Sequence, residues 1–320
     1  MISNHASANF THHFSHNKVH AVNLLNKAIV GFVKLLPKPV VFIFAKKYIA
    51  GVTLDDAIRV TKELNQKGIL ATIDVLGEAV STKKESEMAK NECLTVLDSI
   101  EKNKLNANLS LKPTQLGLII DKDFCFSQIS EILTKAKSYN NFVRIDMEDS
   151  STTDATFELF RTMKQKFSNV GIVVQAYLKR TFDDVKGLNE IGSNYRLCKG
   201  IYVEPAEIAF KQRQEVRDNY LKILELMLDN GNYVGIATHD DYLVEGAYEL
   251  IKRKNISKDR FEFQMLYGVK ESLRDRINKD GYKIRIYVPF GEHWYKYSIR
   301  RLQENPQMAW HITKSIFSFN

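Results

Sequence analysis

An eight-residue segment near the end of the chain, Tyr297–Glu304, carries side chains that could bind a small carboxylate. Residues three and four apart are neighbours on a helix, so Tyr297 and Glu304 flank the adjacent Arg300 and Arg301. A guanidinium group can donate two parallel hydrogen bonds to a carboxylate, and each contributes roughly 1.5–3 kcal/mol when it is shielded from water. We therefore predict a carboxylate clamp. The alternative is a solvated helix with ordinary ion pairs.

The elements that would position this clamp follow a regular pattern. From Gly68 onward, short β-branched runs alternate with longer stretches of helical periodicity, as in β-α-β units. The runs predict strands at Ile69–Val75, Ala107–Lys112, Phe142–Met147, Gly171–Ala176, Tyr195–Lys199, Tyr233–Thr238, Phe261–Leu266 and Lys283–Val288. The stretches predict helices at Glu85–Lys102, Phe126–Tyr139, Asp154–Phe167, Thr181–Ile191, Glu204–Asn230, Asp241–Lys252, Lys270–Lys279 and Tyr295–Glu304.

Eight repeats of strand and helix favour an α/β fold, a (βα)8 barrel of the TIM type. Crossovers of this length make neighbouring strands parallel, and 320 residues accommodate one such barrel with additions. A doubly wound sheet is the alternative. The sequence has no GxGxxG segment after the first predicted strand and no Walker sequence, which argues against that alternative.

Polar residues stand where the predicted strands end. The carboxyl ends of all strands in a barrel share one mouth, and active sites lie there. Each residue alone could be a helix cap, but together they predict a polar site above an apolar barrel. These residues are Asp74, Lys112, Asp146, Glu148, Gln175, Lys199, Thr238, His239, Gln264 and Tyr287.

The composition limits the function classes. The net charge is +8, but lysine and arginine are dispersed among acidic residues, so we exclude specific nucleic-acid binding. Cys93, Cys125 and Cys198 show no CxxC spacing, which argues against a disulfide framework and against a zinc site. We expect no metal site. We also expect a reducing compartment, which would be the cytoplasm, or a mitochondrion in a eukaryote. Peripheral contact with the inner face of a membrane is an additional option.

The N-terminal part differs from the rest. Residues 1–20 hold five of the eight histidines without apolar periodicity, so we expect a disordered leader rather than a metal site. Residues 21–64 are expected to form a helical segment, and residues 65–320 the barrel. Lysines and two prolines interrupt the apolar run Ala28–Ala50, which is therefore too weak to span a membrane but could pack on the body or touch a membrane surface.

The strand-end motifs, in their order, resemble those of flavin-dependent proline dehydrogenases. The resemblance runs from about Tyr48 to Glu304, and the final octapeptide is its most diagnostic part. It implies a distorted (βα)8 barrel that binds FAD, oxidises L-proline to Δ1-pyrroline-5-carboxylate and passes electrons to a quinone. The motifs are Ala107–Lys112, Arg144–Glu148, Val173–Tyr177, Arg196–Tyr202, Ala237–His239, Phe263–Gly268, Tyr287–Gly291 and Tyr297–Glu304.

The resemblance implies a substrate site made of catalytic residues from both ends of the chain. Three cations would hold the substrate carboxylate: Lys112, Arg300 and Arg301. Four side chains would wall the pyrroline ring: Tyr202, Leu266, Tyr287 and Tyr297. Asp146 would support this polar layer through Tyr287.

A flavin site is implied in the same way. Arg196 resembles the arginine near the reactive flavin nitrogen, and Gln175 the residue at the pyrimidine edge. The remaining cofactor contacts would be Lys199, Gly200, Thr238, His239, Gln264 and Glu304. Cys198 and Ile201 depart from the family pattern, where valine and alanine are expected, and the bulk of Ile201 bears on substrate selectivity rather than on the reaction.

Other functions stay open at this level. The same barrel could oxidise 4-hydroxyproline or another cyclic amino acid, or it could bind a carboxylate without a flavin. Oxidation of a C–N bond needs a two-electron acceptor that side chains do not supply, so either oxidation would depend on the flavin. The colour of the purified protein distinguishes a flavin enzyme from a flavin-less barrel.

Overall fold

The protein is described here by a computed structural model covering residues 38–304. Residues 1–37, with the predicted leader, lie outside the described residues, as do residues 305–320 and the side chains of Val40, Phe44 and residues 300–304. The described chain belongs to two units. Ala50–Glu292 forms one of them, and the residues before and after it form the other.

Eight parallel strands form the centre of the larger unit and close into a barrel in sequence order. The first strand pairs with the last, from Leu70 opposite Arg285 to Val75 opposite Phe290. Closure confirms the predicted barrel and excludes the doubly wound sheet, which has open edges. The strands are β1 Leu70–Val75, β2 Ala107–Leu111, β3 Val143–Ile145, β4 Val170–Gln175, β5 Asn194–Cys198, β6 Tyr233–Ala237, β7 Phe261–Leu266 and β8 Ile284–Phe290.

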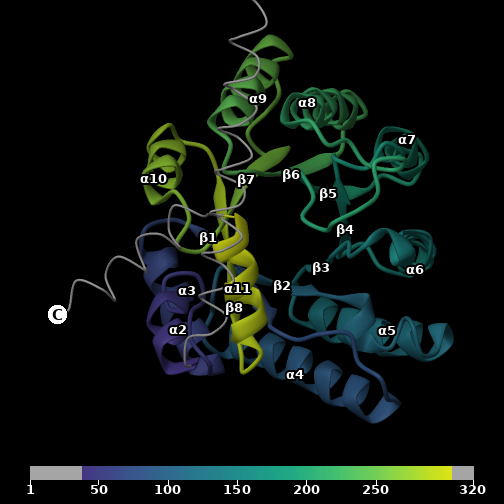
Figure 1. Ribbon diagram of the computed structural model, residues 1–320, viewed down its shortest axis with the longest axis vertical. Helices are drawn as coiled ribbons and strands as arrows, with labels where there is room; N and C mark the ends of the chain where they lie inside the picture. Colours follow the sequence, from purple (N-terminus) through teal and green to yellow (C-terminus); the bar gives the residue numbers. More distant parts are fainter. Residues whose placement is uncertain (1–37, 305–320) are drawn as a thin grey trace, which may run out of the picture. The chain divides into compact units, whose positions relative to one another are not determined.

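Helices of the same unit surround the strands (Figure 1). Two of them, α3 (Leu54–Gln66) and α4 (Lys83–Lys102), begin with a capping box. The side chains of Thr53 and Thr82 each accept a hydrogen bond from the backbone N–H three residues later, and the carboxylate of that later residue accepts one from the backbone N–H of the threonine. The helices are α3 Leu54–Gln66, α4 Lys83–Lys102, α5 Lys122–Ser138, α6 Thr153–Lys166, α7 Thr181–Asn189, α8 Arg213–Asp229, α9 Asp241–Arg253 and α10 Glu271–Lys279.

Alternate strand residues face these helices and form the apolar core. Ile73, Leu109, Ile145, Ile172 and Ile236 are fully buried and belong to one hydrophobic cluster with residues of the helices. This is the period-two pattern of a strand that is apolar toward its helices.

The other strand face, which points into the barrel, is largely polar. Arg196 on β5 donates to Ser110 on β2, and a bond between these two strands must cross the barrel interior. Gly171 leaves space for this layer, because a Cβ there would lie 2.4 Å from a guanidinium nitrogen of Arg144. Aliphatic layers usually fill such barrels. Here charged and amide side chains take their place.

Most predicted boundaries are displaced by one or more residues, and two of the differences have a clear structural cause. The helix predicted at Glu204–Asn230 begins only at Arg213, because the preceding segment pairs its backbone with the β4–α7 loop through the Leu178–Ala209 bridge. The last strand, predicted to end at Val288, continues to Phe290, since Pro289 and Phe290 stay paired with Asp74 and Val75 of β1.

The smaller unit contains α2 Lys38–Ala45 and α11 Trp294–Glu304 among its described residues. Pro39 lies in the first turn of α2, where a missing N–H costs no intrahelical hydrogen bond. The rings of Phe42 and Trp294 join the two helices with centroids 4.8 Å apart. Within residues 38–304, none of the helices combines the length and apolarity needed to cross a membrane.

Candidate active site

Lys112 immediately follows β2 and lies among acidic and phenolic groups at the end of the barrel where the strands finish. Its Nζ is 2.6 Å from Asp74 Oδ1 and 3.5 Å from the Tyr287 hydroxyl. Burial by itself would lower the pKa of Lys112, but the charges of Asp74 and Asp146 outweigh it and raise that pKa above its usual value. Lys112 is therefore a persistent cation.

Asp146 immediately follows β3 and collects three donors. Its Oδ1 accepts hydrogen bonds from Ser110 Oγ at 2.6 Å and from Arg196 Nη1 at 2.8 Å. Its Oδ2 accepts one from the Tyr287 hydroxyl at 3.1 Å, so the contact expected between Asp146 and Tyr287 is present. The guanidinium carbon of Arg196 also lies 5.3 Å from the centre of the Tyr287 ring. One carboxylate thus orients both a cation and a phenol.

A second layer inside the barrel supports Arg196. Its Nε donates to Gln264 Oε1 at 2.6 Å, and Gln264 Nε2 donates to Glu262 Oε1 at 2.6 Å. Glu262 in turn pairs with Arg285 at 2.6 Å and accepts from the Tyr233 hydroxyl at 3.0 Å. Burial would raise the pKa of Glu262, but the charge of Arg285 outweighs it and the pKa lies below its usual value.

The sequence interpretation missed this supporting layer. Glu262 stands two residues before Gln264, and Arg285 two residues before Tyr287, so each pair shares one face of a strand. Charged residues at alternate positions of an otherwise apolar strand were the available signal. Gln264 also lies inside β7 rather than at its end, with both ends of its amide engaged by Arg196 and Glu262. Its predicted cofactor contact stays a prediction.

Five of the residues predicted to bind a cofactor, Gln175, Lys199, Gly200, Thr238 and His239, stand at or just after the ends of β4, β5 and β6. Gln175 Nε2 donates to the Glu148 carbonyl at 2.8 Å, and Thr238 Oγ1 accepts from the Asp240 N–H at 3.1 Å. His239 Nε2 accepts from the Leu266 N–H at 2.8 Å. This bond assigns the proton of a neutral His239 to Nδ1.

A cationic cluster surrounds Asp240, and of its three cations only Lys199 was predicted from the sequence as a site residue. Arg217 Nη2 lies 2.7 Å from Asp240 Oδ1, while Lys199 and Arg213 lie 3.6 and 3.4 Å from Oδ2. Burial by itself would raise the pKa of Asp240, but the three cations outweigh it and hold that pKa well below its usual range. Three positive groups around one carboxylate leave an excess of positive charge beside Thr238.

Gly200 is placed by a steric requirement. Its φ of +109° is one that side-chain-bearing residues rarely adopt, and a Cβ would lie 2.0 Å from a ring carbon of Tyr177. Two residues later Tyr202 is half-buried, whereas Ile201 is 44% exposed. The absence of a side chain at Gly200 therefore lets the backbone after β5 pack directly against the ring of Tyr177.

The remaining predicted residues lie on α11, apart from Leu266 at the end of β7, which is half-buried. Tyr297 is buried, at 7% exposure. Arg300, Arg301 and Glu304 belong to the same helix, but their side chains lie outside the described residues. The predicted roles of these α11 residues stay predictions.

Comparison with known proteins decides the family. The family model described as proline dehydrogenase matches residues 57–313. The chain belongs to the proline dehydrogenase family. It is 38% identical to proline dehydrogenase 1 of Bacillus subtilis strain 168 over 272 residues, which are 85% of this chain and 90% of that protein. It is 33% identical over 270 residues to proline dehydrogenase of Deinococcus radiodurans, which covers 83% of this chain and 87% of the relative.

A solved structure agrees with this family. The crystal structure of proline utilization A from Bdellovibrio bacteriovorus, inactivated by N-propargylglycine, superposes with a TM-score of 0.77 at 28% identity. The match covers 82% of this chain but only 32% of that longer protein. The family predicted from the strand-end motifs is thus confirmed, and the fold is shared with a domain-sized part of a proline utilization protein.

Proposed function

We propose that this member of the proline dehydrogenase family oxidises L-proline to Δ1-pyrroline-5-carboxylate, the first step of proline catabolism, with FAD as hydride acceptor and a quinone as the next electron acceptor. Family membership supports the oxidation of proline. The observation that carries the proposal is the network in which Asp146 orients Arg196 and Tyr287 beside the cation Lys112.

Substrate binding follows from the charges in this network. Lys112 remains protonated, so it can attract the carboxylate of proline, and Arg300 and Arg301 would complete the clamp. Tyr287 would present its ring to the pyrrolidine, because its hydroxyl is already engaged by Asp146. Tyr202, Leu266 and Tyr297 would supply the other walls. A ring held at one end and packed on its faces keeps one orientation and excludes water.

The residues present fit FAD. A diphosphate carries negative charge, and the cluster of Lys199, Arg213 and Arg217 around Asp240 has positive charge in excess. Gly200 follows Lys199 directly, so its backbone would lie beside the cofactor. Gln175, Arg196, Lys199, Gly200, Thr238, His239, Gln264 and Glu304 would hold the cofactor. FAD supplies the two-electron acceptor when it is bound.

Within this arrangement the protein's own groups act by position and charge. Asp146 and Gln264 hold opposite sides of the Arg196 guanidinium, so this cation stays oriented without a substrate. Preorganised charge of this kind costs no reorganisation during a reaction.

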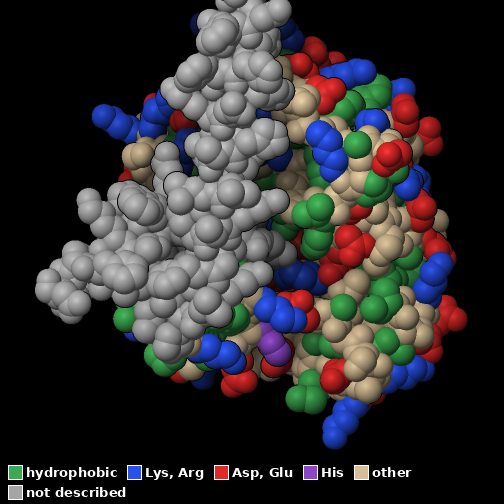
Figure 2. Space-filling model, in the orientation of Figure 1, with side chains coloured by type: hydrophobic (Ala, Val, Ile, Leu, Met, Phe, Trp, Pro, Cys, Tyr) green, Lys and Arg blue, Asp and Glu red, His purple; other side chains and the backbone are tan. Residues whose placement is uncertain are grey.

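Delivery of electrons to a quinone would bring the protein to a membrane surface. We propose a peripheral contact made through electrostatic attraction, which the net charge of +8 supports. On the face shown in Figure 2, basic and acidic side chains of the described residues are interspersed rather than separated, so this attraction would be weak and sensitive to salt.

An anaerobic titration of the flavin-loaded protein with L-proline tests the reaction and cofactor together. The visible absorbance of oxidised flavin should bleach with one equivalent of proline per flavin. A parallel titration with trans-4-hydroxy-L-proline should bleach the flavin much less. Bleaching by neither compound, or equal bleaching by both, would overturn the assignment to proline.

A further inference from the structure

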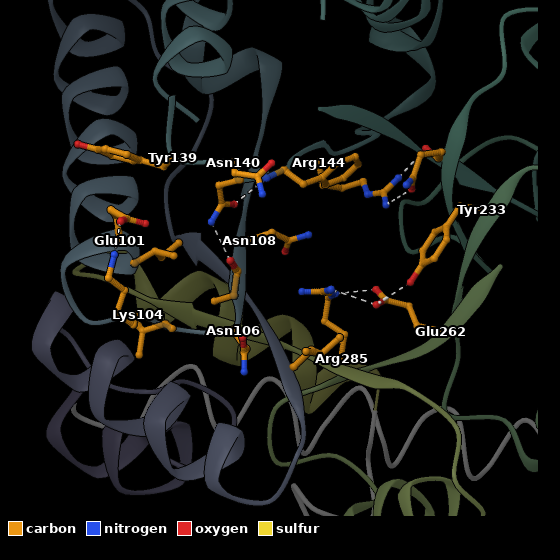
Figure 3. A pocket seen from close by; sticks show the side chains of 17 residues that line it. Glu101, Lys104, Asn106, Asn108, Tyr139, Asn140, Arg144, Tyr233, Glu262 and Arg285 are labelled. Carbon is orange, nitrogen blue, oxygen red and sulfur yellow. Dashed lines mark hydrogen bonds and ion pairs between the residues drawn. The ribbon is translucent and has the colours of Figure 1, made fainter. Parts of the chain in front are cut away.

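A cavity of about 510 Å³ opens at the opposite end of the barrel, where the strands begin. We call it the N-terminal hollow. It lies at the far end of the strands from Lys112 and Lys199, which follow strand ends, so it is separate from the proposed proline site. Figure 3 shows the side chains around it. The ones that matter here are Asn106, Asn108, Arg144, Tyr233, Glu262 and Arg285.

Arg144 is the unusual member of this lining. Its side chain is 2% exposed. Nη1 donates to the Asn194 carbonyl at 2.6 Å and to the Ile172 carbonyl at 3.3 Å, and Nη2 donates to Asn194 Oδ1 at 2.6 Å. Its Nε is buried and has no hydrogen-bond partner among the described residues. Gly171 makes room for this guanidinium, since a Cβ there would collide with it.

The guanidinium carbon of Arg144 lies 4.8 Å from the centre of the Phe142 ring, but its charge has no paired carboxylate among the described residues. Arg196 pairs with Asp146, and Arg285 pairs with Glu262, but within the described part of the chain no ion pair joins Arg144 to a carboxylate. Of these three guanidinium groups inside the barrel, two are each paired with a carboxylate of the described chain and Arg144 is not. Burial, and next the charge of Arg196, lower the pKa of Arg144 to about 9. Burying an unpaired charge is costly, and it usually finds a counter-ion.

Neutral amides complete the wall of the hollow. Asn108 Oδ1 accepts a hydrogen bond from Thr72 Oγ1 at 2.5 Å. The other end of this amide, Nδ2, is therefore a hydrogen-bond donor. Arg285 uses Nε and Nη2 for Glu262 and donates from Nη1 to the Ala71 carbonyl at 2.8 Å, and Nη1 carries a second hydrogen. Guanidinium and amide donors are the groups that recognise a carboxylate.

We propose that the N-terminal hollow is a second ligand site of this protein, which binds a small organic acid through its carboxylate. The carboxylate would neutralise Arg144 and accept hydrogen bonds from Arg144, Arg285 and the asparagine amides. The volume is enough for a molecule larger than an inorganic ion. Inorganic sulfate shares the oxyanion chemistry, so it serves as a comparison for charge without an organic skeleton.

The test measures thermal unfolding of the flavin-loaded enzyme against succinate, acetate or sulfate, at constant ionic strength balanced with a bulky sulfonate. A ligand that binds only the folded protein raises Tm in a saturable way. We expect a rise of a few degrees with succinate, and less with acetate. A larger effect of sulfate than of succinate would assign the site to inorganic oxyanions instead and overturn the organic-acid proposal.

Two variants and two controls locate the effect. Arg144→Met removes the unpaired cation, and Asn106→Phe places a larger side chain at an exposed position of the hollow. Each substitution should weaken the binding of succinate at least about tenfold. Asn91→Phe makes the same change on the exposed face of α4 and should leave the response unaltered. Lys112→Met, in the proposed proline site, should also leave it unaltered.

The outcome does not depend on the proposed proline chemistry. A response lost in Lys112→Met would place the acid in the proline site, and a response retained in folded Asn106→Phe would place it outside the hollow. Either result, or the absence of a saturable response in the unaltered enzyme, would overturn the proposal. Proline turnover by Asn106→Phe shows that this variant is folded and flavin-loaded, so a failure of Arg144→Met to fold does not remove the test.

Discussion

Substitution of Glu262 by glutamine tests the supporting layer beneath the candidate active site. The Glu262 side chain is 2% exposed and receives hydrogen bonds from Arg285 at 2.6 and 3.0 Å, from Gln264 at 2.6 Å and from Tyr233 at 3.0 Å. Glutamine keeps the shape and one acceptor, but it removes the charge and offers a donor toward groups that themselves donate. Arg285 would then be buried without a counter-ion.

The expected cost follows from that unpaired charge. Removal of one partner of a buried ion pair destabilises a protein by about 3–5 kcal/mol, against a total stability of about 5–15 kcal/mol. At roughly 2–4 °C per kcal/mol for a large domain, Tm of the flavin-loaded protein should fall by about 6–20 °C. The double substitution Glu262→Gln with Arg285→Met should lower Tm by less than the sum of the two single substitutions, because it leaves no unpaired charge at this ion pair.

The matched control is Glu63→Gln on α3. Glu63 also accepts from an arginine, Arg59, at 2.9 Å, but both side chains are more than half exposed. Solvent screens such a pair, so Tm should change by less than about 2 °C. Equal changes in Tm for the two substitutions would refute the argument that the buried layer is a specific ion-pair network.

The pH dependence of this pair has a definite sign. The folded-state pKa of Glu262 is lower than its usual value, so its contribution to stability is present above the unfolded pKa of about 4.3. That contribution is lost as the pH falls through the folded value. The difference in Tm between the unaltered protein and Glu262→Gln should therefore narrow as pH is lowered below about 4.

Four further predictions concern the site and the surface. Lys112→Met should lower kcat/KM for proline about tenfold to a hundredfold with little change in flavin content, because one charged contact is lost; unchanged kinetics would contradict its role. Tyr287→Ser should reduce activity on proline but narrow the preference over trans-4-hydroxy-L-proline, since space and a partner for the hydroxyl appear; the ratio of kcat/KM values measures this. Gly200→Ala should lower Tm and flavin content, whereas Gly192→Ala, at φ +61° with open space around it, should cost only backbone strain of about 1 kcal/mol; similar losses in both would exclude a steric cause. The protein should bind anionic vesicles at low salt and be released as salt rises, and equal binding to neutral vesicles would exclude electrostatic attraction.

Local patterns were sufficient to predict the barrel. A strand that is apolar toward its helices and a helix that buries one stripe are both visible in ten to twenty residues, and eight repeats of them leave few arrangements. The positions of Lys112, Asp146 and Lys199 just after their strands followed from the same alternation, because the ends of parallel strands meet at one mouth. The family was predictable from the order of the strand-end motifs, and the match over residues 57–313 confirms it.

The chain's tertiary structure alone decided how these residues pair. Arg196 meets Ser110 and Asp146 across the barrel, and Glu262 meets Arg285 on the next strand, although these partners stand 23 to 86 positions apart in sequence. Such contacts depend on barrel closure and register, which no short window of sequence contains. The late start of α8 has the same origin, since the loop before it pairs with a distant segment. So does the N-terminal hollow: Arg144 is left without a carboxylate only because the folded barrel assigns the neighbouring ones to Arg196 and Arg285.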